Sequence, residues 1–414
     1  MASRVVIVGA GPAGITVAEA LREHDQEVEI AMLSSEPFPP YAPPAMADHF
    51  LTGRDETLFW KGRDVCQRLK VDYLPNTTAE SLLPQSHALS LSNGSTLTYD
   101  QLVIATGSGL YAPVAGHQLP GLYNFKSLSA AKQLVDGVRA GKVRSAIIVG
   151  AGFIGVELAL LLQDSGVSVT MVEIEDRLMW RMLELETAEI VLESVRGRGV
   201  EGRLNTRATA FLGSGEVTGV ELESGEVLRA DAYIAATGVK PNIEWLQGSG
   251  VQTNWGILVD DFLRTNIPDV YAAGDVAETR DRMTGERFVH AIFPNAVDQA
   301  RVVANGLLGY EERYEGAESM NSLKHLGVEV MAVGAQRGEE ELRWRKNGQL
   351  RKLFLNDGRI VGFRLVGNVR GAGVYRSLML RGVDVRAFRE RLLDPRPGAS
   401  WFGSASGDTL VLER

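Results

Sequence analysis

A glycine-rich loop between an apolar strand and a helix constrains this sequence more than any other feature, and it occurs twice. The first copy is Gly9-Ala10-Gly11-Pro12-Ala13-Gly14, which follows the apolar run 4–8 and precedes a helix expected at 15–23. In such a G-x-G-x-x-G loop the glycines allow a tight turn, a close approach of ligand to backbone, and packing of helix on strand. The N–H groups at the helix start then face phosphates. This copy therefore predicts a dinucleotide-binding site.

The second copy is Gly150-Ala151-Gly152-Phe153-Ile154-Gly155, between the apolar run 145–149 and a helix expected at 156–163. The same spacing in the same strand–loop–helix context predicts a second dinucleotide site. Two such sites are far more specific than one, and strands that alternate with helices favour an α/β fold with parallel sheets.

An acidic residue follows each loop at the distance typical of a ribose ligand. Glu36 follows a strand expected at 28–33, and Glu173 follows a strand expected at 167–172. A carboxylate there accepts hydrogen bonds from ribose hydroxyls and repels a 2′-phosphate, so NAD is favoured over NADP at the second site. Arg177 lies close enough in the sequence to soften that preference, or it is an ordinary solvated residue.

The cysteine content limits how this chain can move electrons. Cys66 is the single cysteine among 414 residues. This excludes an intrachain disulfide, a Cys-x-x-Cys pair, and a cysteine-ligated iron–sulfur cluster or four-cysteine zinc site within the chain. We predict no metal site and a buried structural role for Cys66. A redox reaction then needs borrowed cofactors, most economically FAD and NAD.

The charge distribution is uneven. The chain holds 43 Lys and Arg against 52 Asp and Glu, a formal net charge of −9, whereas residues 341–414 hold 15 and 7. This balance disfavours nucleic acid as a partner. No apolar run is long enough for a membrane span. A core-like strand begins almost at Met1, which argues against a signal peptide, so we expect a cytoplasmic protein.

Further segments resemble one enzyme family in the expected order: 99–108, 231–242 and 265–277. With the two loops they make the sequence similar to the FAD- and NAD(P)-dependent pyridine nucleotide–disulfide oxidoreductases over almost the whole chain. Within that family it most resembles NADH:rubredoxin and ferredoxin reductases, the flavin-binding part of nitrite reductases, and the flavoprotein subunit of phenylglyoxylate dehydrogenase-like complexes.

The resemblance implies two Rossmann-like three-layer domains and a small C-terminal α+β domain. The FAD-binding domain would take residues 1–115 and 245–318, the NAD-binding domain 116–244, and the C-terminal domain 319–414.

The resemblance also implies cofactor-binding residues. Those for FAD are Gly9, Gly11, Pro12, Ala13, Gly14, Glu36, Ala105, Thr106, Gly107, Gly274, Asp275, Asn295 and Ala296. Those for NAD are Gly150, Gly152, Phe153, Ile154, Gly155, Glu173 and Gly238. Asp275 would bind the ribityl chain, and the helix from Asn295 would begin under the flavin pyrimidine. Glu157, the catalytic candidate, would lie near the nicotinamide; the alternative is an ordinary ion pair.

One segment departs from the family pattern. Disulfide reductases of the family carry two cysteines, and the peroxidases one, where this chain has 39–49 without sulfur nucleophiles. Disulfide and sulfenic-acid chemistry are therefore excluded as mechanisms. Pro43 and Asp48 stand where the similar reductases usually carry cations. His49 and His290 could border a flavin cleft, although a structural role is the simpler interpretation.

The C-terminal region predicts a small α+β domain. Strands are expected at 341–346, 349–356 and 359–366, joined by Asn-Gly and Asp-Gly turns, and helices at 372–381 and 385–393. Its basic residues either steer an acidic redox protein or form solvated strand faces: Arg343, Arg345, Lys346, Arg351 and Lys352. The extended tail after Asp394 carries Trp401-Phe402, which either anchors a partner or covers the domain's own core.

The sequence therefore predicts an FAD-dependent NADH:acceptor oxidoreductase. Without a thiol relay, its flavin would exchange electrons directly, in either direction, with a separate iron–sulfur protein or with an iron–sulfur subunit of a hetero-oligomeric complex. The alternatives are an NADH oxidase that reduces oxygen and a flavin-bearing interaction or assembly protein.

Overall fold

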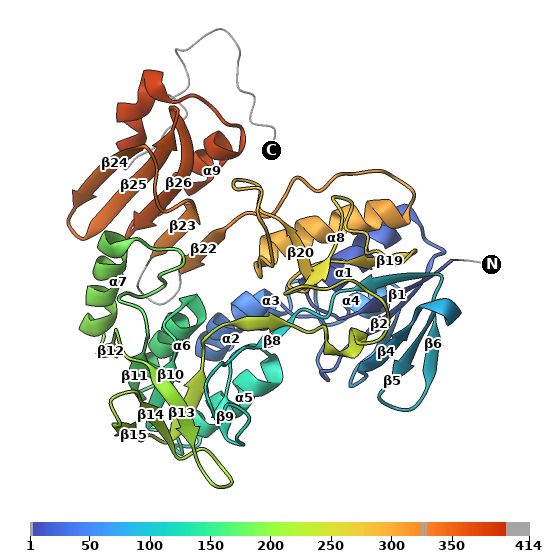
Figure 1. Cartoon of the computed structure of the whole chain (residues 1–414), viewed down its shortest axis with the longest axis horizontal. Helices are drawn as coiled ribbons and strands as arrows, with labels where there is room; N and C mark the ends of the chain where they lie inside the picture. Colours follow the sequence, from blue (N-terminus) through green and yellow to red (C-terminus); the bar gives the residue numbers. More distant parts are fainter. Residues whose placement is uncertain (1–2, 324–326, 328, 395–414) are drawn as a thin grey trace. The chain divides into compact units, whose positions relative to one another are not determined.

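The computed structural model describes residues 3–323, 327 and 329–394, which form two compact units (Figure 1). The first unit comprises Met1–Arg144, Ala210–Gly219 and Arg229–Ser319; the second comprises Ser145–Thr209, Val220–Leu228 and Met320–Arg414. Each unit contains one of the glycine-rich loops, directly after a parallel strand.

A parallel sheet of five strands is the centre of the first unit. Its order is β19 (Val270–Ala272), β7 (Gln101–Ile104), β1 (Arg4–Val8), β2 (Glu29–Leu33) and β3 (Val71–Leu74). Past their first residues, β1, β2 and β7 are buried throughout, as expected for strands covered on both faces. The helices α1 (Pro12–His24) and α8 (Phe293–Leu307) pack against each other, side by side in Figure 1.

Shorter elements complete the first unit. Its helices are α2 (Met46–Thr52), α3 (Asp55–Leu58), α4 (Val65–Arg68) and α5 (Leu128–Arg139), with 3₁₀ turns at Pro43–Ala45, Pro84–Ser86 and Glu244–Leu246. Its other strands are β4 (Ala79–Leu83), β5 (Ala88–Leu91), β6 (Thr96–Thr98), β8 (Ser108–Leu110), β9 (Leu122–Tyr123), β16 (Ala232–Ala235), β17 (Val239–Pro241), β18 (Ile257–Leu258), β20 (Ala277–Arg280) and β21 (Arg287–Phe288). The strands β8 and β17 pair antiparallel, which joins two of the segments that the family resemblance named, 99–108 and 231–242.

The second unit repeats the strand–loop–helix arrangement. Its parallel strands are β10 (Ser145–Val149), β11 (Ser168–Val172) and β12 (Glu201–Arg203), and its helices here are α6 (Phe153–Asp164) and α7 (Leu185–Gly197). The run 158–162 of α6 is buried without interruption, because it is apolar on all sides. The strand β15 (Val227–Leu228) also belongs to this unit, whereas β13 (Ala208–Leu212) and β14 (Gly219–Leu222) each have residues in both units.

An antiparallel sheet forms the C-terminal part of the second unit. Its order is β22 (Met320–Leu323), β23 (Val330–Gly334), β26 (Arg359–Val366), β25 (Gln349–Asn356) and β24 (Glu340–Lys346). The hairpin turns Asn347-Gly348 and Asp357-Gly358 have positive φ at both positions, as type I′ turns require. The helix α9 (Ala372–Leu380) packs on β26, and a 3₁₀ segment spans Arg386–Leu393.

The predicted α/β class and the three C-terminal strands are confirmed, to within one residue for the strands. The last expected helix is wrong in type, because a break at Phe388 leaves a 3₁₀ segment. The predictions for Trp401 and Phe402 lie outside the described residues.

The expected role of the basic residues is wrong for two of them. Arg351 and Lys352 are 1% and 4% exposed, so they neither steer a partner nor form a solvated face. Adjacent residues of a strand point to opposite faces. Arg351 donates to the Tyr375 hydroxyl at 2.7 Å, whereas Lys352 contacts Glu184 and Glu186 near the start of α7.

Two structural features, a membrane-spanning helix and a metal-binding group of side chains, are not found among the described residues. None of the helices in 3–323 and 329–394 is both long and apolar enough to cross a membrane. The same part of the chain holds no group of three or more His, Cys, Asp or Glu side chains arranged to bind a metal.

Candidate cofactor-binding site

The first glycine-rich loop is packed so tightly that two of its glycine positions have no room for a side chain. A Cβ added at Gly9, whose φ is +116°, would lie 2.1 Å from the carbonyl oxygen of Ala105. A Cβ at Gly14 would lie 1.9 Å from the carbonyl oxygen of Gly9. The structure thus brings Gly9, Gly14 and the end of β7 together, as the sequence predicted.

Gly11 is different, because a Cβ there would meet no atom within 4 Å. It caps α1, and no side chain accepts a hydrogen bond from the amides of the first turn. Pro12 takes the first helical position, where a missing N–H costs nothing. The glycine therefore leaves open space beside bare amides, which is what an anionic group at a helix N-terminus needs.

A second glycine brings two helix starts to the same place. Gly274 has φ +80°, and a Cβ there would lie 3.1 Å from the Cβ of Ala13 in α1 and 3.6 Å from that of Ala296 in α8. The Gly274 amide donates to the buried Gln299 side chain at 2.7 Å. The loop after β19 and the N-termini of two long helices therefore converge, and their dipoles favour negative charge here.

Asp275 is held at this convergence by two side chains of the same unit. Its Oδ2 accepts from the Ser108 hydroxyl at 2.8 Å and from Lys126 Nζ at 2.9 Å. Lys126 stands just before α5 and carries no motif, so nothing in the sequence pointed to it.

Three hydrogen bonds join the segment 105–107 to Asn242, at the end of the segment 231–242. Asn242 donates from its side chain to the Thr106 carbonyl at 2.9 Å and from its amide to the Gly107 carbonyl at 3.0 Å. The Thr106 hydroxyl donates to the Asn242 carbonyl at 2.9 Å. The positive φ of Gly107, +64°, allows this arrangement.

The Glu36 carboxylate, which the sequence predicts to bind a ribose, accepts three hydrogen bonds within the protein. Its Oε1 accepts from the amide and hydroxyl of Ser129 at 2.9 and 2.8 Å. Its Oε2 accepts from the Tyr41 hydroxyl at 2.5 Å, and Tyr41 in turn accepts from the Leu128 amide at 3.0 Å. Burial and the neighbouring Glu36 carboxylate raise the pKa of Tyr41 far above its usual range. Glu36 thus accepts a hydrogen bond from an amide in the first turn of α5, whose N-cap residue is Ser127.

The Asn295 side chain is 4% exposed and is bonded to the Glu318 backbone. It donates to the Glu318 carbonyl at 3.0 Å and accepts from the Glu318 amide at 3.1 Å. What Asn295 can offer a ligand is therefore the start of α8, not its amide group.

His290 and His49 both have protein partners, in line with structural roles. His290 lies 3.1 Å from Asp281. Burial alone would raise the pKa of Asp281, but hydrogen bonds from His290, Thr284 and the Met283 amide outweigh it and lower that pKa to about 2.

The second glycine-rich loop has the same construction within the other unit. Gly150 has φ +103°, and its amide donates to the Val172 carbonyl at 2.8 Å. Gly152 caps α6 with no side-chain hydrogen bond, and a Cβ there would meet nothing within 4 Å. Glu173, 6% exposed, accepts from the Ala151 amide at 2.7 Å. This carboxylate therefore lies beside the loop, and its predicted role as a ribose ligand stays a prediction.

The other predicted residues of this site lie on α6, except one. Phe153 and Ile154 form its first turn, with Ile154 41% exposed, and Gly155 is buried. Gly238 belongs to the first unit, where its carbonyl accepts from the Tyr111 amide at 3.0 Å. Arg177 is engaged, because its Nε donates to the Leu183 carbonyl at 3.0 Å.

Glu157 lies one turn into α6, and the ion pair that was its alternative role is not found among the described residues. Burial raises the pKa of its carboxyl to about 7, with no compensating charge. A carboxyl with such a pKa changes its protonation near neutral pH, which is a common property of residues at active sites.

The residues of both loops fit a phosphate-bearing dinucleotide. Each loop offers a bare helix start and a glycine whose missing Cβ leaves open space, namely Gly11 and Gly152. The first unit adds Gly274 and Asp275 at the end of β19. The fold and these sites define a flavoprotein class that binds two dinucleotides on repeated α/β modules.

Comparison with known proteins agrees with this class. A sequence profile of the pyridine nucleotide-disulphide oxidoreductase family matches residues 3–300. The chain is 30% identical over 402 residues to the NADH-dependent phenylglyoxylate dehydrogenase subunit epsilon of Aromatoleum evansii, covering 94% of each chain. It is 26% identical over 397 residues to an NADH oxidase of Methanocaldococcus jannaschii, covering 89% of this chain and 88% of the other. A ferredoxin reductase structure from Rhodopseudomonas palustris superposes with a TM-score of 0.83 at 27% identity, covering 92% and 95%.

The chain belongs to the pyridine nucleotide-disulphide oxidoreductase family. It is an oxidoreductase enzyme that uses FAD and a nicotinamide nucleotide, as its sequence predicted.

Substitution of Asp275 tests the first site. Asp275→Ala removes the acceptor for Ser108 and Lys126, and it removes a carboxylate from the point where two helix starts converge. We expect purified protein with less than about half of the wild-type FAD content, read from its visible absorbance. The exposed Asp72→Ala is the matched control and should retain its flavin. A fully yellow Asp275→Ala protein would contradict the assignment.

Substitution of Glu157 tests its raised pKa. The folded state holds this proton up to about pH 7, whereas the ordinary pKa is 4.5, so the contribution of Glu157 to stability is lost as pH rises between these values. Glu157→Gln should remove this loss, so that its melting temperature exceeds the wild type by roughly 2–4 °C at pH 8 but not at pH 4.5. The exposed Glu189→Gln is the control, and equal melting curves at both pH values would refute the raised pKa.

Proposed function

We propose that this chain is an NADH:acceptor oxidoreductase that exchanges electrons directly between its flavin and an iron–sulfur protein or subunit. The observation that carries the proposal is the position of the lone thiol. Cys66 lies on α4 in the core of the first unit, and burial raises its pKa to about 11. A thiol with that pKa is neither an effective nucleophile nor a relay at neutral pH.

FAD would be held by the first unit. The amides at the start of α1 and the space at Gly11 suit its pyrophosphate, and Gly274 lets backbone approach the same group. Asp275 would bind the ribityl chain and Glu36 a ribose hydroxyl through lone pairs that Tyr41 and Ser129 leave free. Residues 1–115 and 245–318 would form this domain.

NAD would be held by the loop after β10. The start of α6 suits the pyrophosphate, and Glu173, fixed by the Ala151 amide, suits the adenosine ribose of NAD rather than NADP. Arg177 is held by hydrogen bonds to the Leu183 carbonyl and the Asp176 carboxylate, which supports its interpretation as an ordinary solvated residue. Residues 116–244 would form this domain and 319–414 the third.

The chain's own groups then set the conditions for hydride transfer. When bound, FAD accepts a hydride from reduced nicotinamide and can release electrons singly. The N-terminus of the fifteen-residue helix α8 supplies partial positive charge where the flavin pyrimidine is expected. Glu157, with its carboxyl poised near pH 7, would position the nicotinamide end. No protein thiol takes part.

Two relatives favour a protein as the electron partner. One is a subunit of an NADH-dependent dehydrogenase and one is a ferredoxin reductase, and each match covers more than nine-tenths of both chains. The NADH oxidase among the relatives keeps oxygen as the second candidate acceptor.

A direct assay separates these acceptors. With NADH, the FAD-loaded protein should reduce a ferredoxin or rubredoxin at least about tenfold faster than the same concentration of free FAD does. Oxygen consumption is measured in parallel with an oxygen electrode. Rapid oxygen uptake with no carrier reduction would favour the oxidase, and reduction of artificial acceptors alone would count against both protein carriers.

Removal of the thiol tests the absence of a relay. Cys66→Ala should change the rate of acceptor reduction by less than about twofold, since the thiol is buried and its pKa is raised to about 11. A small fall in melting temperature is expected from the cavity. A tenfold loss of activity in folded, flavin-loaded Cys66→Ala protein would show that the thiol takes part.

A further inference from the structure

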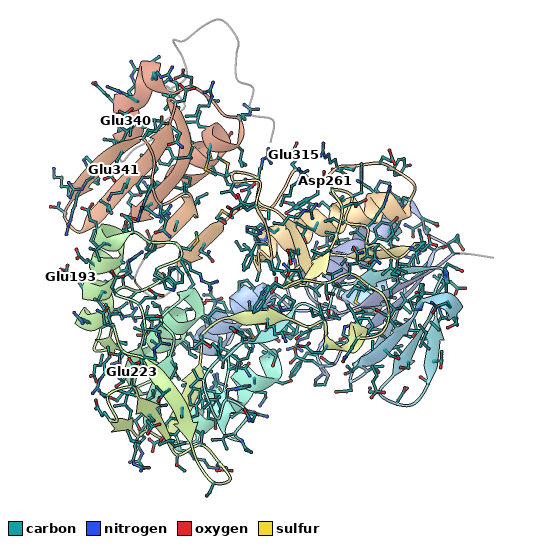
Figure 2. All side chains as sticks on the ribbon, in the orientation of Figure 1. Glu193, Glu223, Asp261, Glu315, Glu340 and Glu341 are labelled. Atoms are coloured by element: carbon teal, nitrogen blue, oxygen red, sulfur yellow. The ribbon has the colours of Figure 1, made fainter. Side chains whose placement is uncertain are left out.

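The start of α7 is joined to the C-terminal sheet by buried charges. Lys352 on β25 has a 5% exposed side chain, and its Nζ lies 3.1 Å from Glu184 Oε1, 2.8 Å from Glu186 Oε2 and 3.2 Å from Glu341 Oε1. Figure 2 labels Glu341 on this sheet and Glu193 farther along α7. One buried ammonium thus holds three carboxylates from two elements.

A second buried cation faces the same glutamate. Arg364 on β26 is fully buried, and its guanidinium donates to the carbonyls of Val333 and Phe363 at 2.8 Å. Its Nε lies 3.8 Å from Glu184 Oε2, and neither atom has a hydrogen-bond partner. Burial lowers the pKa of Arg364 to about 10, and Glu184 opposes this shift.

Glu184 is also the residue that starts α7. Its side chain accepts from the buried Thr187 hydroxyl, and its carbonyl accepts the Ala188 amide at 3.0 Å. Glu184 is therefore the N-cap residue of α7 and directly follows the segment 174–183.

The segment 174–183 in turn holds the second glycine-rich loop. The Met179 amide donates to the Ala151 carbonyl at 2.9 Å, and Glu173 accepts from the Ala151 amide at 2.7 Å. Both backbone groups of Ala151 are thus fixed by this segment and by the strand end before it. Gln336 of the C-terminal part donates to the Trp180 carbonyl at 3.0 Å.

We propose that Lys352 and Arg364 are positioning residues for the nicotinamide nucleotide. They act through Glu184 on the segment 174–183, and this segment sets the shape of the glycine-rich loop through Ala151. The proposal rests on the assignment of NAD to this loop. It gives the C-terminal domain a role in binding NADH, in addition to any role in docking a partner.

Lys352→Met tests the proposal by removing the charge and keeping the apolar stem. In FAD-loaded full-length protein, with NADH and ferricyanide, we expect KM for NADH to rise about tenfold and kcat to change less than twofold. FAD content should stay at the wild-type level, and Lys352→Arg should recover most of the affinity. Lys346→Met, on an exposed lysine of the same sheet, is the matched control and should leave KM unchanged.

A milder variant covers the case in which Lys352→Met does not fold. Gln336→Ala removes one surface hydrogen bond to the segment and should raise KM for NADH about twofold to threefold, with an unchanged melting temperature. A merely structural role would lower stability without moving KM at temperatures far below melting. Wild-type KM in Gln336→Ala, and in folded Lys352→Met, would overturn the proposal.

The same assay separates this inference from the proposed function. If the wild-type protein itself does not bind NADH, the assignment of NAD to the loop fails, and the positioning role fails with it. If the wild type binds NADH and the variants bind it equally well, only the positioning role is wrong.

Discussion

Contact between backbone and backbone, with no side chain between, is the constraint on which the first cofactor site depends. At Gly9 a single added carbon would overlap the carbonyl of Ala105, and at Gly14 it would overlap that of Gly9. This close contact puts the start of α1 directly after β1. Its amides then point into space that Gly11 leaves open. The convergence of α1, α8 and Gly274 follows, because three chain segments can approach this closely only where their side chains are small.

Two charged residues of the C-terminal region, Arg351 and Lys352, are buried although their sequence pattern is typical of an exposed strand. A strand rich in Arg and Lys predicts a basic surface, yet Arg351 and Lys352 are buried on opposite faces of β25. Their charged ends meet Tyr375 on one side and glutamates near the start of α7 on the other. Buried cations need partners, and Lys352 finds two of its partners, Glu184 and Glu186, more than 160 residues earlier in the chain.

Some residues of the cofactor sites could be predicted from the sequence, and others were found only in the structure. The glycine loops and Glu173 follow from local spacing, because a strand–loop–helix unit positions its own ends, and the family resemblance points to Asp275. Lys126 and Ser108, which hold Asp275, and Ser129, which binds Glu36, come from other parts of the chain and carry no motif of their own. The Asn295 side chain turned out to bind the Glu318 backbone, a pairing that only the return of the chain past α8 creates.

The sequence alone determined the α/β class, the two dinucleotide loops, the hairpins with their Asn-Gly and Asp-Gly turns, and the absence of a redox thiol pair. Each of these depends on residues within one short segment, so the pattern and its structural consequence are read together. The tertiary structure decided which charged groups are buried, which carboxylates were already bonded within the protein, and what supports the segment 174–183. Those outcomes depend on contacts between residues far apart in the chain, and burial is a property of such contacts that no local pattern contains.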